Sequence, residues 1–108
     1  MPRIPLSYLA TVAMVAWSGA CFANDVTVTQ QNLSFDRESI HVAVGDTIHF
    51  LNKDDEFHNI FSLSDDATFD LGAFGRGEER SYTFASPGTV EVECAIHPGM
   101  QLTVDVGD

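Results

Sequence analysis

Cysteine is scarce in this chain of 108 residues and occurs only as Cys21 and Cys94. Because Cys21 falls within a predicted export signal, Cys94 is the only cysteine expected in the mature chain. An intramolecular disulfide is therefore excluded. A lone thiol in an exported protein must be buried, bound to a metal or paired with another chain. A bound metal would also stabilise so small a fold directly.

Basic residues are few as well: five in all against 16 acidic residues, for a formal net charge of −11. Every acidic residue lies beyond residue 23, whereas Arg3 precedes it, so the mature chain is one unit more negative than the whole. Nucleic acid and anionic membranes are poor partners for such a surface. A basic protein partner, attracted by long-range electrostatic steering, suits it better, and the same charge also maintains solubility.

No apolar run is long enough to serve as a permanent membrane anchor. The longest, Leu6–Trp17, falls short of the roughly 20 residues that a spanning helix needs. Arg3 before it and the small-residue sequence Cys21-Phe22-Ala23 after it are typical of a secretory signal. We therefore predict a signal peptide over residues 1–23, cleaved near Ala23, export to the periplasm, and a single domain over residues 24–108.

Helical periodicity is absent beyond the signal, and strict alternation of apolar and polar residues takes its place. Turn residues such as Pro87-Gly88 separate the alternating runs. Six or more short strands in so short a chain predict an all-β fold, either a two-sheet antiparallel sandwich or a small barrel. Residues 64–77, rich in aspartate and glycine, are predicted to form the longest loop. The alternating runs are 25–29, 39–44, 48–50, 57–63, 79–85, 89–94 and 100–106.

A thiol, an imidazole and a thioether follow one another at three-residue intervals, as Cys94, His97 and Met100. Cys94 is in phase with Val92, and Met100 is in phase with Leu102, so strand parity directs both sulfur atoms into the interior. Taken singly, each could be an ordinary core residue, which is the usual role of both types. A histidine between them, in a proline-glycine loop, favours a site for a soft metal.

The remaining histidines compete for the place of a further ligand. His41 and His49 each lie between two apolar residues, so both belong to polar strand faces and are predicted to be exposed to solvent. His58 instead follows the charged turn 52–56 and begins an apolar run, a position from which a second loop can supply a ligand. The alternative is that His58 is simply a polar residue at the end of a strand.

The four candidates His58, Cys94, His97 and Met100 form a two-imidazole, one-thiolate set with one weak thioether. This set is typical of a mononuclear blue-copper electron-transfer site, in which methionine is the distant axial ligand. Zinc would more often recruit further cysteine, histidine or carboxylate ligands. A Cys-His nucleophilic pair is the enzyme alternative, but the inward direction of Cys94 and the small domain argue against it.

The stretch from Val92 to Met100, with Pro87-Gly88 before it and His58-Asn59 upstream, resembles the cupredoxins, the family of plastocyanin, pseudoazurin and amicyanin. Its equal three-residue spacings are most similar to those of amicyanin. The resemblance implies a Greek-key antiparallel β-sandwich of seven to eight strands with one type 1 copper ion.

For the site, the resemblance implies that His58 and His97 bind copper through imidazole nitrogens, Cys94 through its thiolate, and Met100 axially. Asn59 matches the residue that braces the two ligand loops by hydrogen bonding, and such outer contacts orient ligands and tune the potential. The outer edge of His97 is the electron port that the resemblance implies.

The function implied is that of a soluble periplasmic one-electron carrier, a monomer that cycles between Cu(I) and Cu(II) and is not an enzyme. Its partner would be a redox protein, such as a basic c-type cytochrome or a copper or quinoprotein enzyme, oriented by the acidic residues 54–56 and 65–66. The alternative is a protein of copper delivery or tolerance with the same ligands. Such proteins often carry methionine- or histidine-rich tracts, whereas Met100 is the only methionine beyond residue 23.

Overall fold

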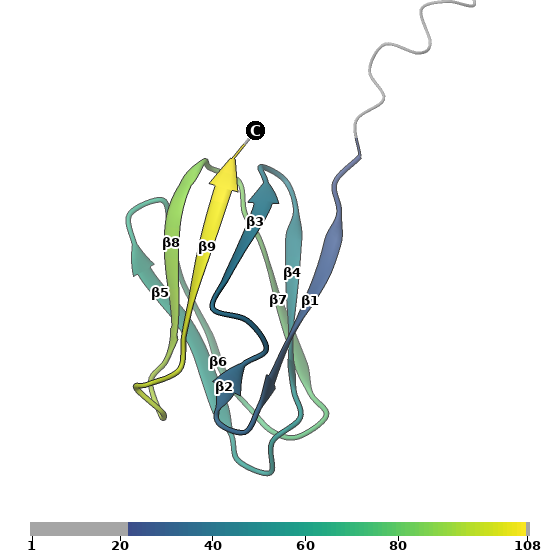
Figure 1. Ribbon diagram of the computed structural model, residues 1–108, viewed down its shortest axis with the longest axis vertical. Helices are drawn as coiled ribbons and strands as arrows, with labels where there is room; N and C mark the ends of the chain where they lie inside the picture. The colour runs from purple at the N-terminus through teal and green to yellow at the C-terminus, as the bar shows by residue number, and fades with distance from the viewer. Residues whose placement is uncertain (1–21, 108) are drawn as a thin grey trace, which may run out of the picture.

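A computed structural model describes residues 22–107, which form nine strands arranged in two facing sheets (Figure 1). Residues 1–21 of the predicted signal peptide lie outside the described residues. Within residues 22–107, no helix is long and apolar enough to cross a membrane. The strands are β1 (Asp25–Gln31), β2 (Ser34–Phe35), β3 (Ser39–Ala43), β4 (Thr47–Asn52), β5 (His58–Ser64), β6 (Ala67–Phe74), β7 (Glu79–Thr83), β8 (Gly88–Cys94) and β9 (Gln101–Gly107).

One sheet has the strand order β2-β1-β4-β7 and the other β3-β9-β8-β5-β6. The predicted all-β sandwich is confirmed, but nine strands replace the seven to eight expected. The sheets are also mixed rather than purely antiparallel, because β1 runs parallel to β4 and β3 runs parallel to β9. The chain changes sheets after β2 and again after β3, which brings these pairs side by side in the same direction. Alternation fixes which side chains point inward, not the direction of a neighbouring strand.

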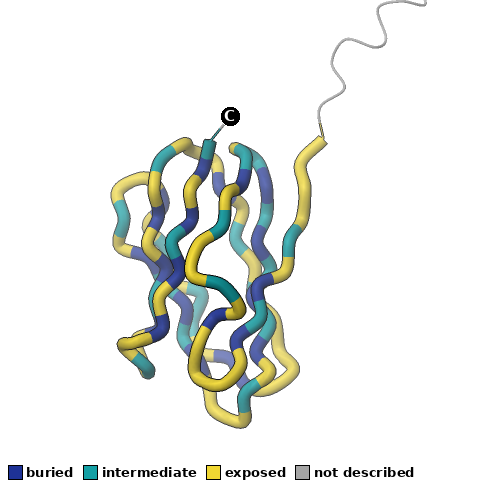
Figure 2. Tube along the Cα trace, viewed as in Figure 1, coloured by how far each residue is buried: buried dark blue, intermediate teal, exposed yellow. Residues whose placement is uncertain are grey.

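The core is built from the inward-facing residues of both sheets, and buried positions alternate with exposed ones along the strands (Figure 2). Ile48 and Phe50 of β4, in one sheet, and Val90 and Val92 of β8, in the other, belong to the same core, and all four are fully buried. A β-rich sequence with this period can bury one face of each sheet against the other. The result is a rigid frame whose loops are held at its two ends.

The predicted loop over residues 64–77 is wrong, since most of it forms β6, an edge strand paired antiparallel with β5. Ala67, Phe69 and Leu71 alternate inward as in any strand. The alternation of inward and outward side chains is then interrupted before the buried Phe74. Gly72 has a positive φ of 77°, and the pairing register between β5 and β6 shifts there. One extra residue in a strand breaks the two-residue period, as in a β-bulge.

Two connections meet at the end of the sandwich opposite the C-terminus: residues 53–57 between β4 and β5, and residues 95–100 between β8 and β9 (Figure 1). The fully buried Asn52 anchors the first connection. Its Nδ2 donates to the backbone oxygens of Glu56 and Phe74, both at 2.9 Å, and its Oδ1 accepts from the Asp54 N–H at 2.8 Å. The turn that follows Asn52 is thereby fixed against the frame.

Candidate metal centre

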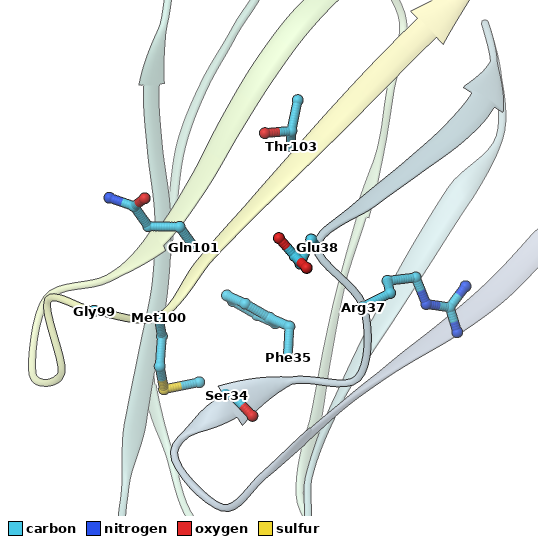
Figure 3. A pocket seen from close by; sticks show the side chains of 8 residues that line it. All are labelled: Ser34, Phe35, Arg37, Glu38, Gly99, Met100, Gln101 and Thr103. Carbon is cyan, nitrogen blue, oxygen red and sulfur yellow. The ribbon is translucent and has the colours of Figure 1, made fainter.

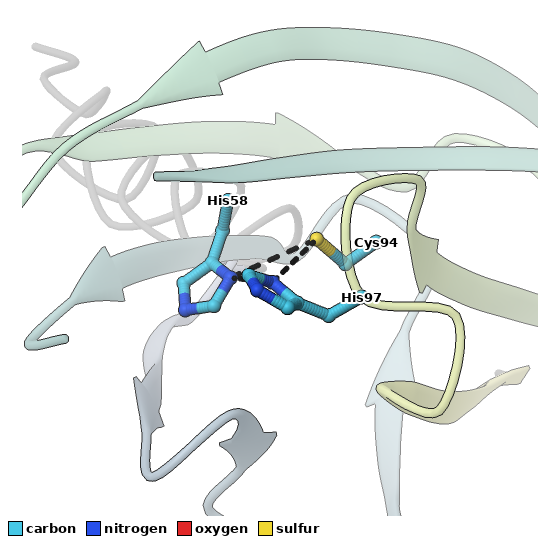
Figure 4. A group of neighbouring side chains, drawn as sticks. All are labelled: His58, Cys94 and His97. Carbon is cyan, nitrogen blue, oxygen red and sulfur yellow. Dashed lines mark hydrogen bonds between the residues drawn. The ribbon is translucent and has the colours of Figure 1, made fainter. Parts of the chain in front are cut away.

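Three of the four predicted ligands converge at this end of the sandwich (Figure 4). His58 is the first residue of β5, Cys94 is the last of β8, and His97 lies in the connection that follows. The Cys94 Sγ is 3.7 Å from the His58 Nδ1 and 3.9 Å from the His97 Nδ1, and the two Nδ1 atoms are 3.2 Å apart. A triangle of this size suits a single first-row metal ion with bonds of about 2.0–2.3 Å.

The three side chains differ in their access to solvent. His58 and Cys94 are fully buried, whereas the His97 side chain is 19% exposed. Strand pairing explains part of this placement, because Ile60 of β5 lies opposite Cys94 of β8, which puts His58, two residues before Ile60, at the same end of the strand pair as Cys94. Only the imidazole of His97 therefore connects the centre with the surface.

The outer nitrogens of both imidazoles are bound by carboxylates. The His58 Nε2 lies 2.8 Å from the Asp54 Oδ2, and the His97 Nε2 lies 3.1 Å from the Glu56 Oε1. A carboxylate only accepts, so this network assigns the proton of each ring to Nε2 and leaves a lone pair on each Nδ1. Two lone pairs and a sulfur then face one another, an arrangement that a cation would satisfy.

Asp54 is held as a carboxylate by several donors. Besides His58, it accepts from the backbone N–H groups of Asn32 and Leu33, at 2.7 and 3.0 Å, in the β1–β2 turn. Burial alone would raise the pKa of Asp54, but the hydrogen bonds from His58, Leu33 and Asn32 outweigh it and lower that pKa below its usual value. The charge that orients His58 is thus secured by the fold.

Asn59, predicted to brace the ligand loops, links them through its backbone. Its N–H donates to the Cys94 Sγ at 3.3 Å, and its carbonyl oxygen accepts from the Ala95 N–H at 3.3 Å. The side-chain amide turns instead to the Asp70 Oδ1, at 3.1 Å. The hydrogen bond to the sulfur is of the kind that tunes the potential of a thiolate-bound copper.

Met100, the predicted axial ligand, is buried at the end of the same loop. Its N–H donates to the His97 carbonyl oxygen at 2.9 Å, which closes the turn between the two residues. Met100 also borders a pocket of about 360 Å³ between β2 and β9 (Figure 3). Its role as a ligand stays a prediction.

Neither of the other two histidines belongs to the centre. His41 is exposed, as predicted, and its Nδ1 lies 3.7 Å from the Asp105 carboxylate. His49 is only 29% exposed and is held between Asp25 and Glu79. His49 therefore lies on the polar outer face, as predicted, but it is only partly exposed to solvent, because Asp25 on β1 and Glu79 on β7 contact both of its ring nitrogens.

The sequence matches the family described as copper binding proteins, plastocyanin/azurin family, over residues 22–107. Solved structures support this relationship. A methionine-to-alanine variant of amicyanin with Cu(I) is 25% identical, with a TM-score of 0.71 over 76% of this chain and 81% of that chain. A proline-to-glycine variant of amicyanin, reduced at pH 4, is 26% identical, with a TM-score of 0.70 over 82% of this chain and 86% of that one.

A third similar structure is the Cu-containing nitrite reductase (NirK) from Thermus scotoductus SA-01. It is 28% identical, with a TM-score of 0.72 over 78% of this chain. The match spans only 22% of the length of the nitrite reductase chain, whereas it spans most of the amicyanins. A comparison with curated protein sequences gives no match.

Proposed function

Since this chain belongs to the plastocyanin/azurin family of copper-binding proteins, we propose that it carries single electrons by cycling one type 1 copper ion between Cu(I) and Cu(II). The observation that supports this proposal is the convergence of two imidazole Nδ1 atoms and one thiol sulfur within 4.8 Å of one another. Soft and borderline donors in this combination suit copper in both oxidation states.

His58 and His97 would hold the copper ion through imidazole nitrogens and Cys94 through its thiolate, and Met100 would add a weak thioether ligand. Copper, when bound, supplies the one-electron couple. The protein supplies a site that changes little between the two states, because His58 and Cys94 lie on the neighbouring strands β5 and β8. Little rearrangement on electron transfer means a fast exchange of electrons.

His97 is the proposed route for electrons, as its imidazole is the one that reaches the surface. The exposed apolar side chains of Phe57 and Ile96 directly precede the two histidine ligands in the sequence. Apolar groups beside an electron port allow a partner to approach closely and exclude water. The acidic surface beyond them favours a basic redox protein, either a c-type cytochrome or a copper or quinoprotein enzyme.

We propose that the protein acts in the periplasm, on the basis of the signal pattern in residues 1–23. We also propose that it has no substrate chemistry of its own. A catalytic thiol must reach its substrate, whereas the thiol of Cys94 is fully buried. Its two nearest imidazoles direct their inner nitrogens toward it, as metal ligands do.

Electron transfer and copper delivery can be separated by mixing Cu(I)-loaded protein with an oxidised, basic c-type cytochrome in a stopped-flow instrument. We expect rapid one-electron reduction of the cytochrome, slowed by added salt, with copper retained over repeated cycles. Copper content after gel filtration provides the second measurement. If copper instead leaves for an apo-protein acceptor while electron exchange stays slow, the protein is one of copper delivery.

A further inference from the structure

The three consecutive carboxylates Asp54, Asp55 and Glu56, here called the acidic turn, each have a defined partner. Asp54 binds the outer nitrogen of His58, and Glu56 binds the outer nitrogen of His97. Asp55, between them, forms an ion pair with Arg76. Because all three carboxylates bind groups of the same molecule, we infer that the turn does more than attract a partner protein.

The two outer carboxylates of the acidic turn, Asp54 and Glu56, are placed so that each contacts one of the two imidazoles. His58 and His97 are far apart in the sequence, but their rings lie 5.0 Å apart, centre to centre, at an angle of 69°. Figure 4 shows that their inner nitrogens face one another beside Cys94. Two carboxylates from alternate positions of one short segment therefore reach both rings from their outer sides, and Asn52 fixes that segment at both Asp54 and Glu56.

We propose that the acidic turn is a clasp that sets how strongly both imidazoles bind Cu(II) relative to Cu(I). A carboxylate that accepts the Nε2 proton raises the electron density on Nδ1 and fixes the ring orientation. The more basic ligand stabilises the ion of higher charge. Asp54 and Glu56 are thus positioning residues that act through His58 and His97, and this inference rests on the proposed copper site.

The two carboxylates contribute unequally. The Asp54 side chain is 12% exposed, so water screens its charge on His58 less than it screens that of an exposed carboxylate, and two backbone N–H groups hold it in place. The Glu56 side chain is 60% exposed and contacts solvent freely. We expect Asp54 to have the larger effect and Glu56 the smaller.

The test compares Asp54→Asn, Glu56→Gln and the matched control Asp55→Asn, using copper-loaded protein. Competition titrations give the dissociation constants for Cu(II) and for Cu(I), and voltammetry gives their ratio. We expect the preference for Cu(II) to fall about tenfold in Asp54→Asn and about threefold in Glu56→Gln. A tenfold change corresponds to about 59 mV in the one-electron potential. The preference of Asp55→Asn for Cu(II) should stay within twofold of the wild-type value.

The control removes the same charge from the same turn without touching a histidine. If Asp55→Asn shifts the ratio as much as its neighbours do, the effect is one of general charge and the clasp is refuted. Unchanged ratios in both Asp54→Asn and Glu56→Gln refute it as well. If Asp54→Asn does not fold, the ratio measured for Glu56→Gln tests the clasp alone, because Glu56 is exposed and its substitution should not disturb folding.

A second readout is independent of the potential. In the diamagnetic Cu(I) protein, the Nε2 proton of His97 should exchange with water more slowly in the wild type than in Glu56→Gln, as measured by NMR of 15N-labelled histidine. Equal exchange rates would overturn the clasp at His97. Failure of the proposed copper site looks different, since wild-type protein would then lack the coloured Cu(II) form altogether.

Discussion

Among the predicted ligands, Met100 is the one whose bond to copper would be the weakest, so its role can be tested without losing the centre. Leucine is similar in volume and should be tolerated in this buried position. We expect Met100→Leu to keep the visible band and to favour Cu(I) by roughly tenfold, because the axial ligand tunes the potential. Voltammetry measures the shift. An unchanged potential would show that Met100 is a core residue and not a ligand.

Gln30 on β1 is fully buried, yet neither atom of its side-chain amide has a hydrogen-bond partner within residues 22–107. An unpaired buried amide costs about 1–3 kcal/mol. We therefore expect Gln30→Met to raise the free energy of unfolding by about 1 kcal/mol or more, measured by urea denaturation. A loss of stability would show that the amide is needed where it lies.

For single residues, the sequence predicts the inward direction of Cys94 from strand parity. It predicts the place of His58 at the start of a strand from the charged turn before β5. The carboxylate partners of the two histidines were missed. In the sequence, Asp54 and Glu56 indicate only an acidic surface that could orient a partner, since nothing in a run of acidic residues shows where each side chain turns. Their contacts depend on Asn52, which bonds to groups distant in sequence as well as to its neighbours.

At the scale of the elements, His49 joins three strands on the outer face of one sheet. From β4, its Nε2 lies 3.1 Å from Asp25 on β1, and its Nδ1 lies 3.0 Å from Glu79 on β7. The hydrogen bond to Asp25, with that to Glu79, outweighs desolvation and raises the pKa of His49 above its usual value. The folded state therefore favours the protonated ring.

The raised pKa gives a definite dependence of stability on pH. The stabilisation from His49 is fully present below the unfolded pKa of about 6.5 and is lost as the pH rises through the higher folded value. We expect wild-type protein to exceed His49→Gln in the free energy of unfolding at pH 5.5, and the difference to shrink at pH 9. Urea denaturation of both proteins at the two pH values tests this. A difference that grows with pH would contradict it.

The strands most easily predicted were those with unbroken alternation, such as β8 and β9. β6 was missed because Gly72 shifts its phase halfway, so that Leu71 and Phe74 both turn inward without being an even number of residues apart. The parallel pairing of β1 with β4 was missed for another reason. It follows from how the chain crosses between the sheets, which local sequence does not encode.

For the whole molecule, a metal that binds only the folded chain should stabilise it as a disulfide would, since Cys94 is the only cysteine within residues 22–107 and is free. Ligand at 100 times its dissociation constant stabilises a fold by about 2.7 kcal/mol, which raises Tm by roughly 10–20 °C in a domain of this size. Calorimetry of the apo and Cu(I) forms measures the shift. Cys94→Ala should lose most of it, and equal Tm values for the two wild-type forms would contradict a resident metal.

The central claim is that Cys94, His58 and His97 hold one copper ion through a thiolate and two imidazoles. The visible absorption spectrum of the Cu(II)-loaded protein tests this claim most directly. We predict an intense thiolate-to-Cu(II) band that a reductant bleaches, that returns on reoxidation and that is absent in Cys94→Ala. A colourless Cu(II) form of the wild-type protein would contradict the claim.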